Sequence, residues 1–419
     1  MNDKPSIIKR IATSIWQLIN VSRKVILNLI FFTLLFVFVG ASMSDKSLVK
    51  IPSETALVLN LYGDVVEQKQ EIDPMDALMS EALNNQDENP EVLLTDIVGT
   101  IKHAATDARI KVLVLKLQHM NRAGLTKLKD IANAIETFKQ TGKEVIAIGD
   151  QFTQDQYYLA SYADKIWLDP KGWLLLDGYG RYQLYFKSAL EKLSITPHIF
   201  RVGTYKSAVE PYIRNDMSPA AKEANQQWLS DLWSQYKKDV ALQRDFSIEN
   251  FDENADKLVA KLKLANGNIA EYALNNQWVD ALKTREQMQS AIIELVGKDA
   301  SHKSFNQVNY SDYFSTLSPA SKLTNINDKD KVAVIVAKGV ILNGIQKAGS
   351  IGGDSTAKLL RRARNNKQVK AVVLRVDSPG GSAYASEIIR QEVELLKKAG
   401  KTVIASMGTY AASGGYWIS

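Results

Sequence analysis

The sequence predicts an α/β protein made of two tandem β-α-β repeats that follow an N-terminal transmembrane helix. Residues 109–161 and residues 368–419 share one order of apolar strand, amphipathic helix, strand and short helix, which is typical of a parallel sheet with helical crossovers. An uncharged apolar run precedes both copies. The hydrophobic content of 45% and the charged content of 23% are those of an ordinary globular protein.

The apolar run, residues 25–41, has 17 residues, which is at the short end for a membrane span. Five basic residues and one acidic residue precede it, so the positive-inside rule places the N-terminus in the cytoplasm. We therefore expect a basic cytoplasmic or interfacial segment at 1–24 and an anchor at 25–43. A cleaved signal peptide is the alternative, because Val39-x-Ala41 places small residues near a possible cleavage site, and both readings export the rest of the chain.

Charge and cysteine content exclude several kinds of function. Four of the six net positive charges lie in residues 1–24, so the remainder has little electrostatic support for binding nucleic acid. The chain has no cysteine, which excludes disulfides, zinc-thiolate sites and a cysteine nucleophile.

The first copy is expected at residues 55–300. Its apolar, β-branched runs predict strands and its periodic runs predict helices. We expect strands at 56–61, 111–117, 144–149 and 198–202, and helices at 95–105, 125–140 and 154–162. Ser218 and Pro219 are placed to cap and open a further long helix.

A polar linker is expected at 301–330, and the second copy at 331–419. The same pattern restarts there with strands at 332–337, 371–376 and 402–406 and helices at 355–365 and 383–399. Many more residues follow the matching position in the first copy, so we expect the second copy to be truncated.

The alignment of the two copies singles out one serine. Lys111 matches Lys370, and after a one-residue gap Gly142-Lys143 matches Gly400-Lys401. Continuing this register sets Gln-Asp-Gln in the first copy against Ala-Ser-Gly-Gly in the second.

Asp155 then stands opposite Ser413. Small neighbours around Ser413 would let a substrate backbone approach, and free N–H groups of a following helix would stabilise a negative intermediate. The alternative is a glycine-rich turn with an ordinary capping serine.

A second glycine turn, DSPGGS at 377–382, follows the strand at 371–376. Ligands of open α/β sheets gather at the carboxyl ends of strands. The N–H of Gly380 or Gly381, paired with that of Gly414, would make an oxyanion hole. A plain tight turn is the alternative.

A serine nucleophile needs a base. None of the four histidines sits in a motif with an acidic partner, so a Ser-His-Asp triad is poorly supported: His103, His119, His198 and His302. A lysine can serve when its surroundings lower its pKa. Lys206 follows a strand and a glycine turn and has apolar neighbours, but spacing alone does not select it from the other lysines.

Three segments, GTYKSAVEPY, DSPGGS and MGTYAASGGYWIS, resemble the long, duplicated form of bacterial signal peptide peptidase A. The resemblance covers nearly the whole chain. It implies a Clp protease/crotonase-like fold and a membrane-anchored serine protease with a Ser/Lys dyad. Ser413 would be the nucleophile and Lys206 the base. The backbone of Gly381 and Gly414 would bind the oxyanion, with Gly380 as the alternative to Gly381.

The resemblance also implies partners and a location. The substrates would be apolar peptides, remnants of signal peptides, and the protein would be a homotetramer that contacts inner-membrane lipids. It would cross the bacterial inner membrane once, with its catalytic part in the periplasm, and would need no cofactor or metal. A non-catalytic membrane scaffold and a crotonase-type acyl-CoA enzyme are the alternatives; export disfavours the second because coenzyme A is cytosolic.

Overall fold

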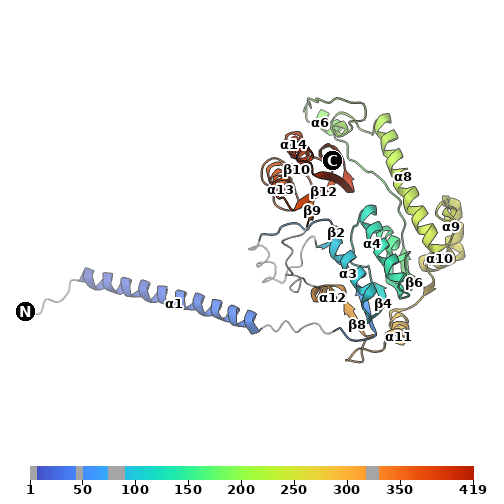
Figure 1. The fold of residues 1–419 in the computed structure, drawn as a ribbon, viewed down its shortest axis with the longest axis horizontal. Helices are drawn as coiled ribbons and strands as arrows, with labels where there is room; N and C mark the ends of the chain where they lie inside the picture. Colours follow the sequence, from blue (N-terminus) through green and yellow to red (C-terminus); the bar gives the residue numbers. More distant parts are fainter. Residues whose placement is uncertain (1–6, 44–50, 74–89, 318–329) are drawn as a thin grey trace, which may run out of the picture. The chain divides into compact units, whose positions relative to one another are not determined.

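The computed structural model describes residues 7–43, 51–73, 90–317 and 330–419, and the chain divides into two compact units, residues 1–50 and 51–419. The first unit contains one continuous helix, α1 (Ile7–Met43) (Figure 1). The segment Ile15–Thr33, 19 residues, is long and apolar enough to cross a membrane. The expected boundary between the interfacial segment, 1–24, and the anchor, 25–43, therefore falls inside one helix. By its length and composition this helix could be a membrane anchor or a signal sequence.

The first region of the second unit, residues 51–317, is built on a parallel six-stranded sheet of order β7-β6-β5-β4-β1-β8. Its strands are β1 (Thr55–Leu59), β4 (Ile110–Leu115), β5 (Glu144–Phe152), β6 (Lys165–Leu174), β7 (Ala281–Leu282) and β8 (Gln307–Asn309). A small parallel pair lies beside it, β2 (Asp64–Val66) and β3 (Glu91–Leu93). The expected strands at 56–61, 111–117 and 144–149 are confirmed as β1, β4 and β5.

Helices cover both faces of this sheet. Alternate residues of a strand point to opposite faces, and Leu57 and Leu59 of β1 enter a different apolar cluster from Ala56 and Val58. The helices of the region are α3 (Leu94–Thr106), α4 (Leu125–Lys139), α5 (Gln154–Ala160), α6 (Lys187–Lys192), α7 (Glu210–Ile213), α8 (Pro219–Arg244), α9 (Ala255–Leu264), α10 (Ile269–Asn275), α11 (Arg285–Val296) and α12 (Tyr310–Thr316). Because the sheet is buried on both faces, the sequences of its central strands are nearly continuous apolar runs.

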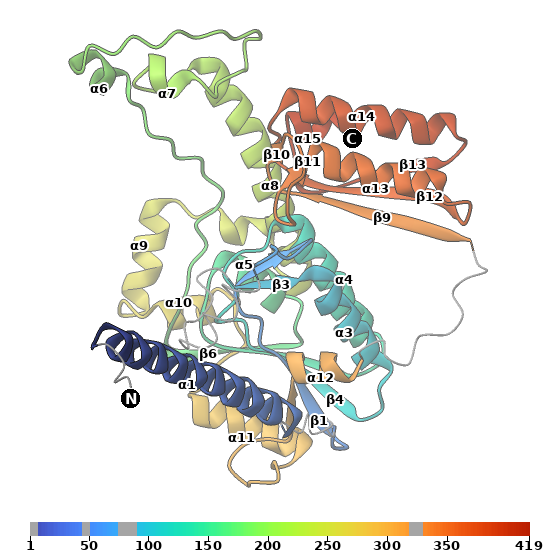
Figure 2. The same cartoon turned by 90° about the vertical axis from the view of Figure 1, so that its left-hand side faces the viewer.

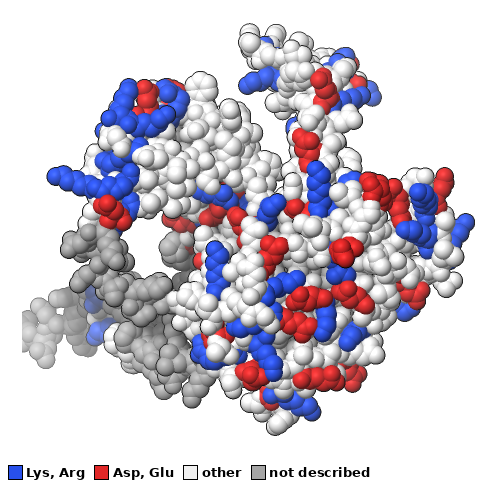
Figure 3. All heavy atoms as spheres, turned by 45° about the vertical axis from the view of Figure 1, so that its right-hand side comes forward, with Lys and Arg blue, Asp and Glu red and all other residues white. Residues whose placement is uncertain are grey.

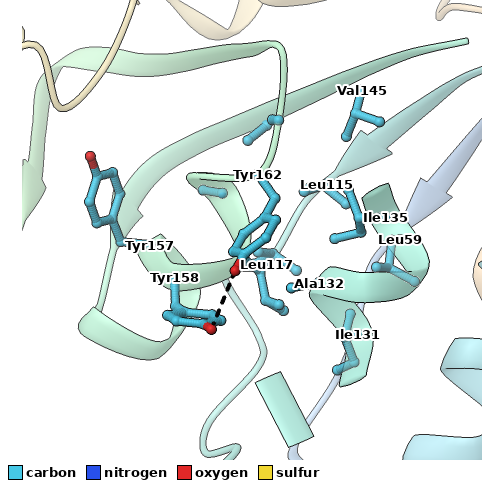
Figure 4. Packing of buried hydrophobic residues seen from close by; sticks show 14 of the residues in the cluster. Leu59, Leu115, Leu117, Ile131, Ala132, Ile135, Val145, Tyr157, Tyr158 and Tyr162 are labelled. Atoms are coloured by element: carbon cyan, nitrogen blue, oxygen red, sulfur yellow. Dashed lines mark hydrogen bonds between the residues drawn. The ribbon is translucent and has the colours of Figure 1, made fainter. Parts of the chain in front are cut away.

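The larger cluster packs α3, α4 and α5 against the sheet and includes several tyrosines. Tyr157, Tyr158 and Tyr162 lie among leucine and isoleucine side chains, and the hydroxyls of Tyr158 and Tyr162 are 3.4 Å apart (Figure 4). Tyr158 also donates a hydrogen bond of 2.7 Å to Asp239 on α8, so α8 is tied to this layer. The N-cap of α8 is Ser218, as expected, and its side chain accepts from the N–H of Ala221.

The second region, residues 330–419, contains a parallel sheet of order β13-β12-β9 (Figure 2). Its elements are β9 (Lys331–Lys338), β10 (Ile341–Leu342), β11 (Ile351–Gly352), α13 (Gly353–Asn365), β12 (Val369–Ser378), α14 (Ala383–Lys398), β13 (Thr402–Ala411) and α15 (Gly414–Trp417). They confirm the expected strands and helices of this region. One face of this sheet packs on α13 and α14 and forms the apolar core of the region. Val332, Val334 and Ile404 lie outside this core and are exposed.

The two regions share one order of elements. β5-β4-β1 corresponds to β13-β12-β9, and each region has a parallel two-stranded pair beside its sheet. Lys143 donates to the carbonyl oxygens of Ala104 and Asp107 at the end of α3, at 2.9 and 2.7 Å. Lys401 likewise donates to the carbonyl oxygens of Ala363 and Asn366 at the end of α13.

Two expectations are wrong. The segment 198–202 forms no strand: Phe200 and Val202 are exposed and have no neighbouring strand with which to pair. Part of the expected linker, 301–330, belongs to the first sheet, because β8 pairs with β1 and buries Val308 while α12 packs beside it.

Candidate active site

Ser413 lies on a strained turn between β13 and α15. Its backbone angles are φ 54° and ψ −119°, which an L-residue rarely adopts. Asp245 also has a positive φ, but its ψ of 44° puts it in the ordinary left-handed region at a helix end. Ser413 is exposed. A strained, exposed serine between a strand and a helix is the geometry of a nucleophile elbow.

The glycine turn after β12 packs directly against Ser413. A Cβ atom on Gly380 would lie 2.7 Å from both the Ser413 Cβ and the Gly414 nitrogen. The φ of Gly380 is 100°, so glycine is required there for its conformation as well as for space. The structure therefore brings together Gly380, Gly381, Ser413 and Gly414, as the sequence predicts for parallel neighbouring strands.

Hydrogen bonding separates the two candidate glycines of this turn. The N–H of Gly380 donates to Ser378 Oγ at 3.1 Å, and that hydroxyl donates to the Gly339 carbonyl at 2.7 Å. The N–H groups of Gly381 and Gly414 have no acceptor among the described residues. A Cβ on Gly414 would lie 3.3 Å from the Gly381 nitrogen, so the two free donors are neighbours. This geometry favours Gly381 over Gly380 as an oxyanion donor.

Lys206 lies in the first region, whereas Ser413 and both glycine turns lie in the second. It is exposed, in the segment between α6 and α7. Figure 2 shows that the chain leaves the sheet after β6, passes through α6 and α7, and returns through α8. Arg201 donates to its carbonyl oxygen at 3.1 Å. In the described part of the chain no hydrogen bond or ion pair joins Lys206 to Ser413.

A buried carboxylate fixes the segment that carries Lys206. Glu210 accepts from the N–H of Ser218 at 3.1 Å and lies 3.9 Å from Arg201. Burial raises the pKa of the Glu210 carboxyl, but the hydrogen bonds from Ser218 together with the charges of Arg214 and Arg201 outweigh burial and hold the pKa below its usual value. Glu210 is therefore an ionised anchor between this segment and the start of α8.

The first region has no strained serine at the corresponding turn. The residue that caps α5 is Thr153, with φ −75° and ψ 169°, so Ser413 corresponds to Thr153 by its place at the helix start. Asp155, which the sequence register set against Ser413, lies two residues further on and accepts from the N–H of Ala123 at 3.1 Å. The register fails because the turns after β5 and β13 differ in length.

Sequence reasoning missed a buried ion pair beside the glycine turn. Lys127 on α4 lies 2.7 Å from Asp377, and their side chains are 6% and 9% exposed. Asp377 also accepts from the N–H of Tyr410 on β13 at 3.0 Å. The position of Asp377 immediately before Ser-Pro-Gly-Gly could have drawn attention to it, but nothing in the sequence indicates Lys127 as its partner.

Charged residues of both signs are scattered over the surface among larger uncharged areas. Figure 3 shows Lys and Arg interspersed with Asp and Glu over the face that it presents. Further ion pairs join the two regions, and the shortest of them are Arg375 with Glu67 at 2.6 Å and Lys338 with Glu91 at 2.8 Å. Paired charges of this kind hold the two regions together.

Comparison with known proteins points to proteases. Peptidase family S49 matches residues 137–298. The chain is 42% identical over 407 residues to "Protease 4" of Haemophilus influenzae and 40% identical over 407 residues to "Protease 4" of Salmonella typhi. These matches cover 96% of this chain and 66% and 65% of the relatives, so the chain spans about two thirds of their length. "Serine protease SPPA, chloroplastic" of Arabidopsis thaliana is 29% identical over 79% of this chain and 48% of that protein.

Proposed function

The chain belongs to peptidase family S49, and from this premise we propose that it is a membrane-anchored serine endopeptidase with Ser413 as its nucleophile. The observation that carries the proposal is the strained, exposed Ser413 beside the unpaired N–H groups of Gly381 and Gly414. Both donors can bind an oxygen that becomes negative when Ser413 Oγ attacks a peptide carbonyl.

Lys206 is the proposed general base. Its amine takes the proton of Ser413 Oγ during attack and gives it to the leaving amine, and water then hydrolyses the acyl-enzyme. The support is the resemblance of GTYKSAVEPY to the lysine segment of signal peptide peptidases. The proposal requires the exposed segment around Lys206 to approach Ser413 in the active form, with Glu210 and Ser218 as its fixed end.

We assign the substrates as apolar peptides left in the membrane when signal peptides are cleaved. α1 supports this assignment, because an apolar helix of this length would hold the protein at a membrane. The basic residues before it favour a cytoplasmic N-terminus and a periplasmic catalytic part at a bacterial inner membrane. The shared element order of the two regions supports tandem Clp protease/crotonase-like repeats, and the family resemblance supports a homotetramer.

Labelling with a fluorophosphonate probe tests the dyad. The full-length protein in detergent is treated across a range of pH, beside Ser413→Ala, Lys206→Ala and the matched control Lys192→Ala, an exposed lysine of α6. We expect labelling to map to Ser413, to be lost in the first two variants and to persist in the control. Labelling that persists in Lys206→Ala would assign the base elsewhere, and an unlabelled wild-type protein would overturn the serine mechanism.

A further inference from the structure

We propose that Lys127, a residue of the first region, is a positioning residue for the nucleophile of the second, acting through Asp377. This inference rests on the proposed function of Ser413. It assigns to the first region a second contribution besides Lys206, made through a buried ion pair rather than at the reacting atoms.

The ammonium group of Lys127 has two polar partners in the second region. Lys127 lies on α4, and its Nζ is 2.7 Å from Asp377 and donates to Thr409 Oγ1 at 2.5 Å. Its side chain is 6% exposed. A lysine buried to this degree is costly without a partner, so the contact with Asp377 fixes where α4 meets the second region.

Asp377 joins three elements at one point. It sits near the end of β12, one of its oxygens accepts from Tyr410 on β13, and its other oxygen meets Lys127 on α4. The pairing of β12 with β13 shifts register between Val376 and Ser378, which is the position of Asp377. The carboxylate therefore replaces regular strand pairing where the two strands diverge toward the two turns.

Both turns of the candidate site begin at this junction. Ser378, the next residue, holds the N–H of Gly380, and Tyr410 lies three residues before Ser413. Close packing leaves little freedom at the junction. A Cβ on Gly124, the residue before α4, would lie 2.1 Å from Thr409 Oγ1, and one on Gly408 would lie 3.1 Å from Asp377 Cβ.

The geometry assigns Lys127 a positioning role rather than that of a base. Its Nζ contacts Asp377 and Thr409, and no hydrogen bond to Ser413 is present among the described residues. If its contact with Asp377 is lost, the glycine turn and Ser413 are held only by their direct packing and by the hydrogen bond of the Ala412 N–H to the Ser378 carbonyl. Small misplacements of reacting groups reduce catalysis strongly.

The experiment compares Lys127→Met with Glu67→Gln in the full-length protein. Glu67→Gln removes the charge of another buried ion pair between the same two regions, with Arg375, without touching Asp377. The measurements are the rate of fluorophosphonate labelling at Ser413, kcat and KM for an apolar peptide, and the thermal midpoint. We expect Lys127→Met to slow labelling and lower kcat by on the order of tenfold to a hundredfold with KM unchanged. Glu67→Gln should label at nearly the wild-type rate.

The double variant Lys127→Met/Asp377→Asn separates positioning from stability. It removes both buried charges, and an asparagine oxygen can still accept from Tyr410, so the thermal midpoint should return toward that of the wild type. Labelling should remain slow, because α4 no longer holds the junction. This variant carries the test if Lys127→Met loses its fold.

Two outcomes would overturn the inference while leaving the proposed function intact. The first is wild-type labelling in Lys127→Met. The second is recovery of the labelling rate together with stability in the double variant, which would give the pair a structural role only. Absence of labelling in the wild-type protein would overturn the proposed function itself, so the two failures are distinguishable.

Discussion

The turn after β5 and the turn after β13 occupy the same place in the two regions but differ in how their backbone groups are hydrogen-bonded. After β5, the side chain of Gln156 accepts from the Thr153 N–H at 3.0 Å and donates to the Met120 carbonyl at 2.9 Å. Asp155 satisfies the N–H of Ala123. After β13, Gly414 and Gly415 follow Ser413, the backbone of Ser413 is strained, and the N–H of Gly414 has no acceptor among the described residues. One fold thus gives a closed, self-satisfied turn or an open one that can bind a substrate oxygen.

Removing the nucleophile should give the largest difference between the two turns. Ser413→Ala in the full-length protein should lower peptide hydrolysis by at least about 10⁴-fold. Gln156→Ala tests the turn after β5. It should leave hydrolysis unchanged but cost about 1–3 kcal/mol of stability, because the Thr153 N–H and the Met120 carbonyl lose their partner. Kinetic assays and thermal unfolding check both. Loss of hydrolysis in Gln156→Ala would mean that the closed turn also takes part in the reaction.

A methyl group in the open turn should be the next most damaging change. A Cβ on Gly381 would lie 2.1 Å from the Ile341 carbonyl oxygen, which is backbone and has little room to move. Gly381→Ala should cost about 1–3 kcal/mol of stability and slow labelling of Ser413.

Gly99→Ala is the matched control for this change. No atom lies within 4 Å of a Cβ at Gly99 on α3, so alanine there should be neutral or slightly stabilising. Equal effects of the two changes would contradict the tight packing of the glycine turn.

The paired lysines test how far the two regions are alike. Lys143 bonds two carbonyls at the end of α3, and Lys401 bonds Ala363 and Asn366 at the end of α13, at 2.7 and 2.6 Å. Burial lowers the pKa of both amines. We expect Lys143→Met and Lys401→Met each to lower the unfolding free energy by about 1–2 kcal/mol, measured by denaturant titration. A large effect of one alone would show that the regions differ in more than their turns.

Asp155 should give the smallest effect and one that depends on pH. Burial raises the pKa of its carboxyl, with the Ala123 hydrogen bond opposing the rise. The stability that this group contributes is present below its unfolded pKa of about 3.9 and is lost as the pH rises through its folded pKa. Asp155→Asn should therefore raise the thermal midpoint near neutral pH, and the gain should shrink in acid. A gain that is constant with pH would exclude titration of Asp155 as its cause.

The central strands and helices of both regions could be predicted from the sequence because the strands are short apolar runs separated by amphipathic helices. The sequence does not predict β6, because charged residues, Pro170 and Gly172 interrupt its apolar pattern. β8 falls within the expected linker, because only its middle residue, Val308, is buried and its sequence is otherwise polar. The apolar residues at 198–202 predicted a strand, but a strand needs a neighbour, and pairing is not visible in one segment.

The candidate site was predictable in its residues but not in its geometry. The small residues around Ser413 and the two glycines of DSPGGS indicated the open turn. The angles of Ser413 and the choice of Gly381 over Gly380 depend on hydrogen bonds that only a folded chain has. The ion pair of Lys127 with Asp377 joins residues far apart in the sequence, so no local pattern could reveal it.

The contact of Lys127 with Thr409 spans 282 residues, and this separation affects when the candidate site can form during folding. Contacts between distant segments form late in folding, after the entropy of closing a long loop has been overcome. The first region is made first and can fold before the second emerges. The turn that carries Ser413, the proposed nucleophile, is therefore completed only after both regions have folded and docked.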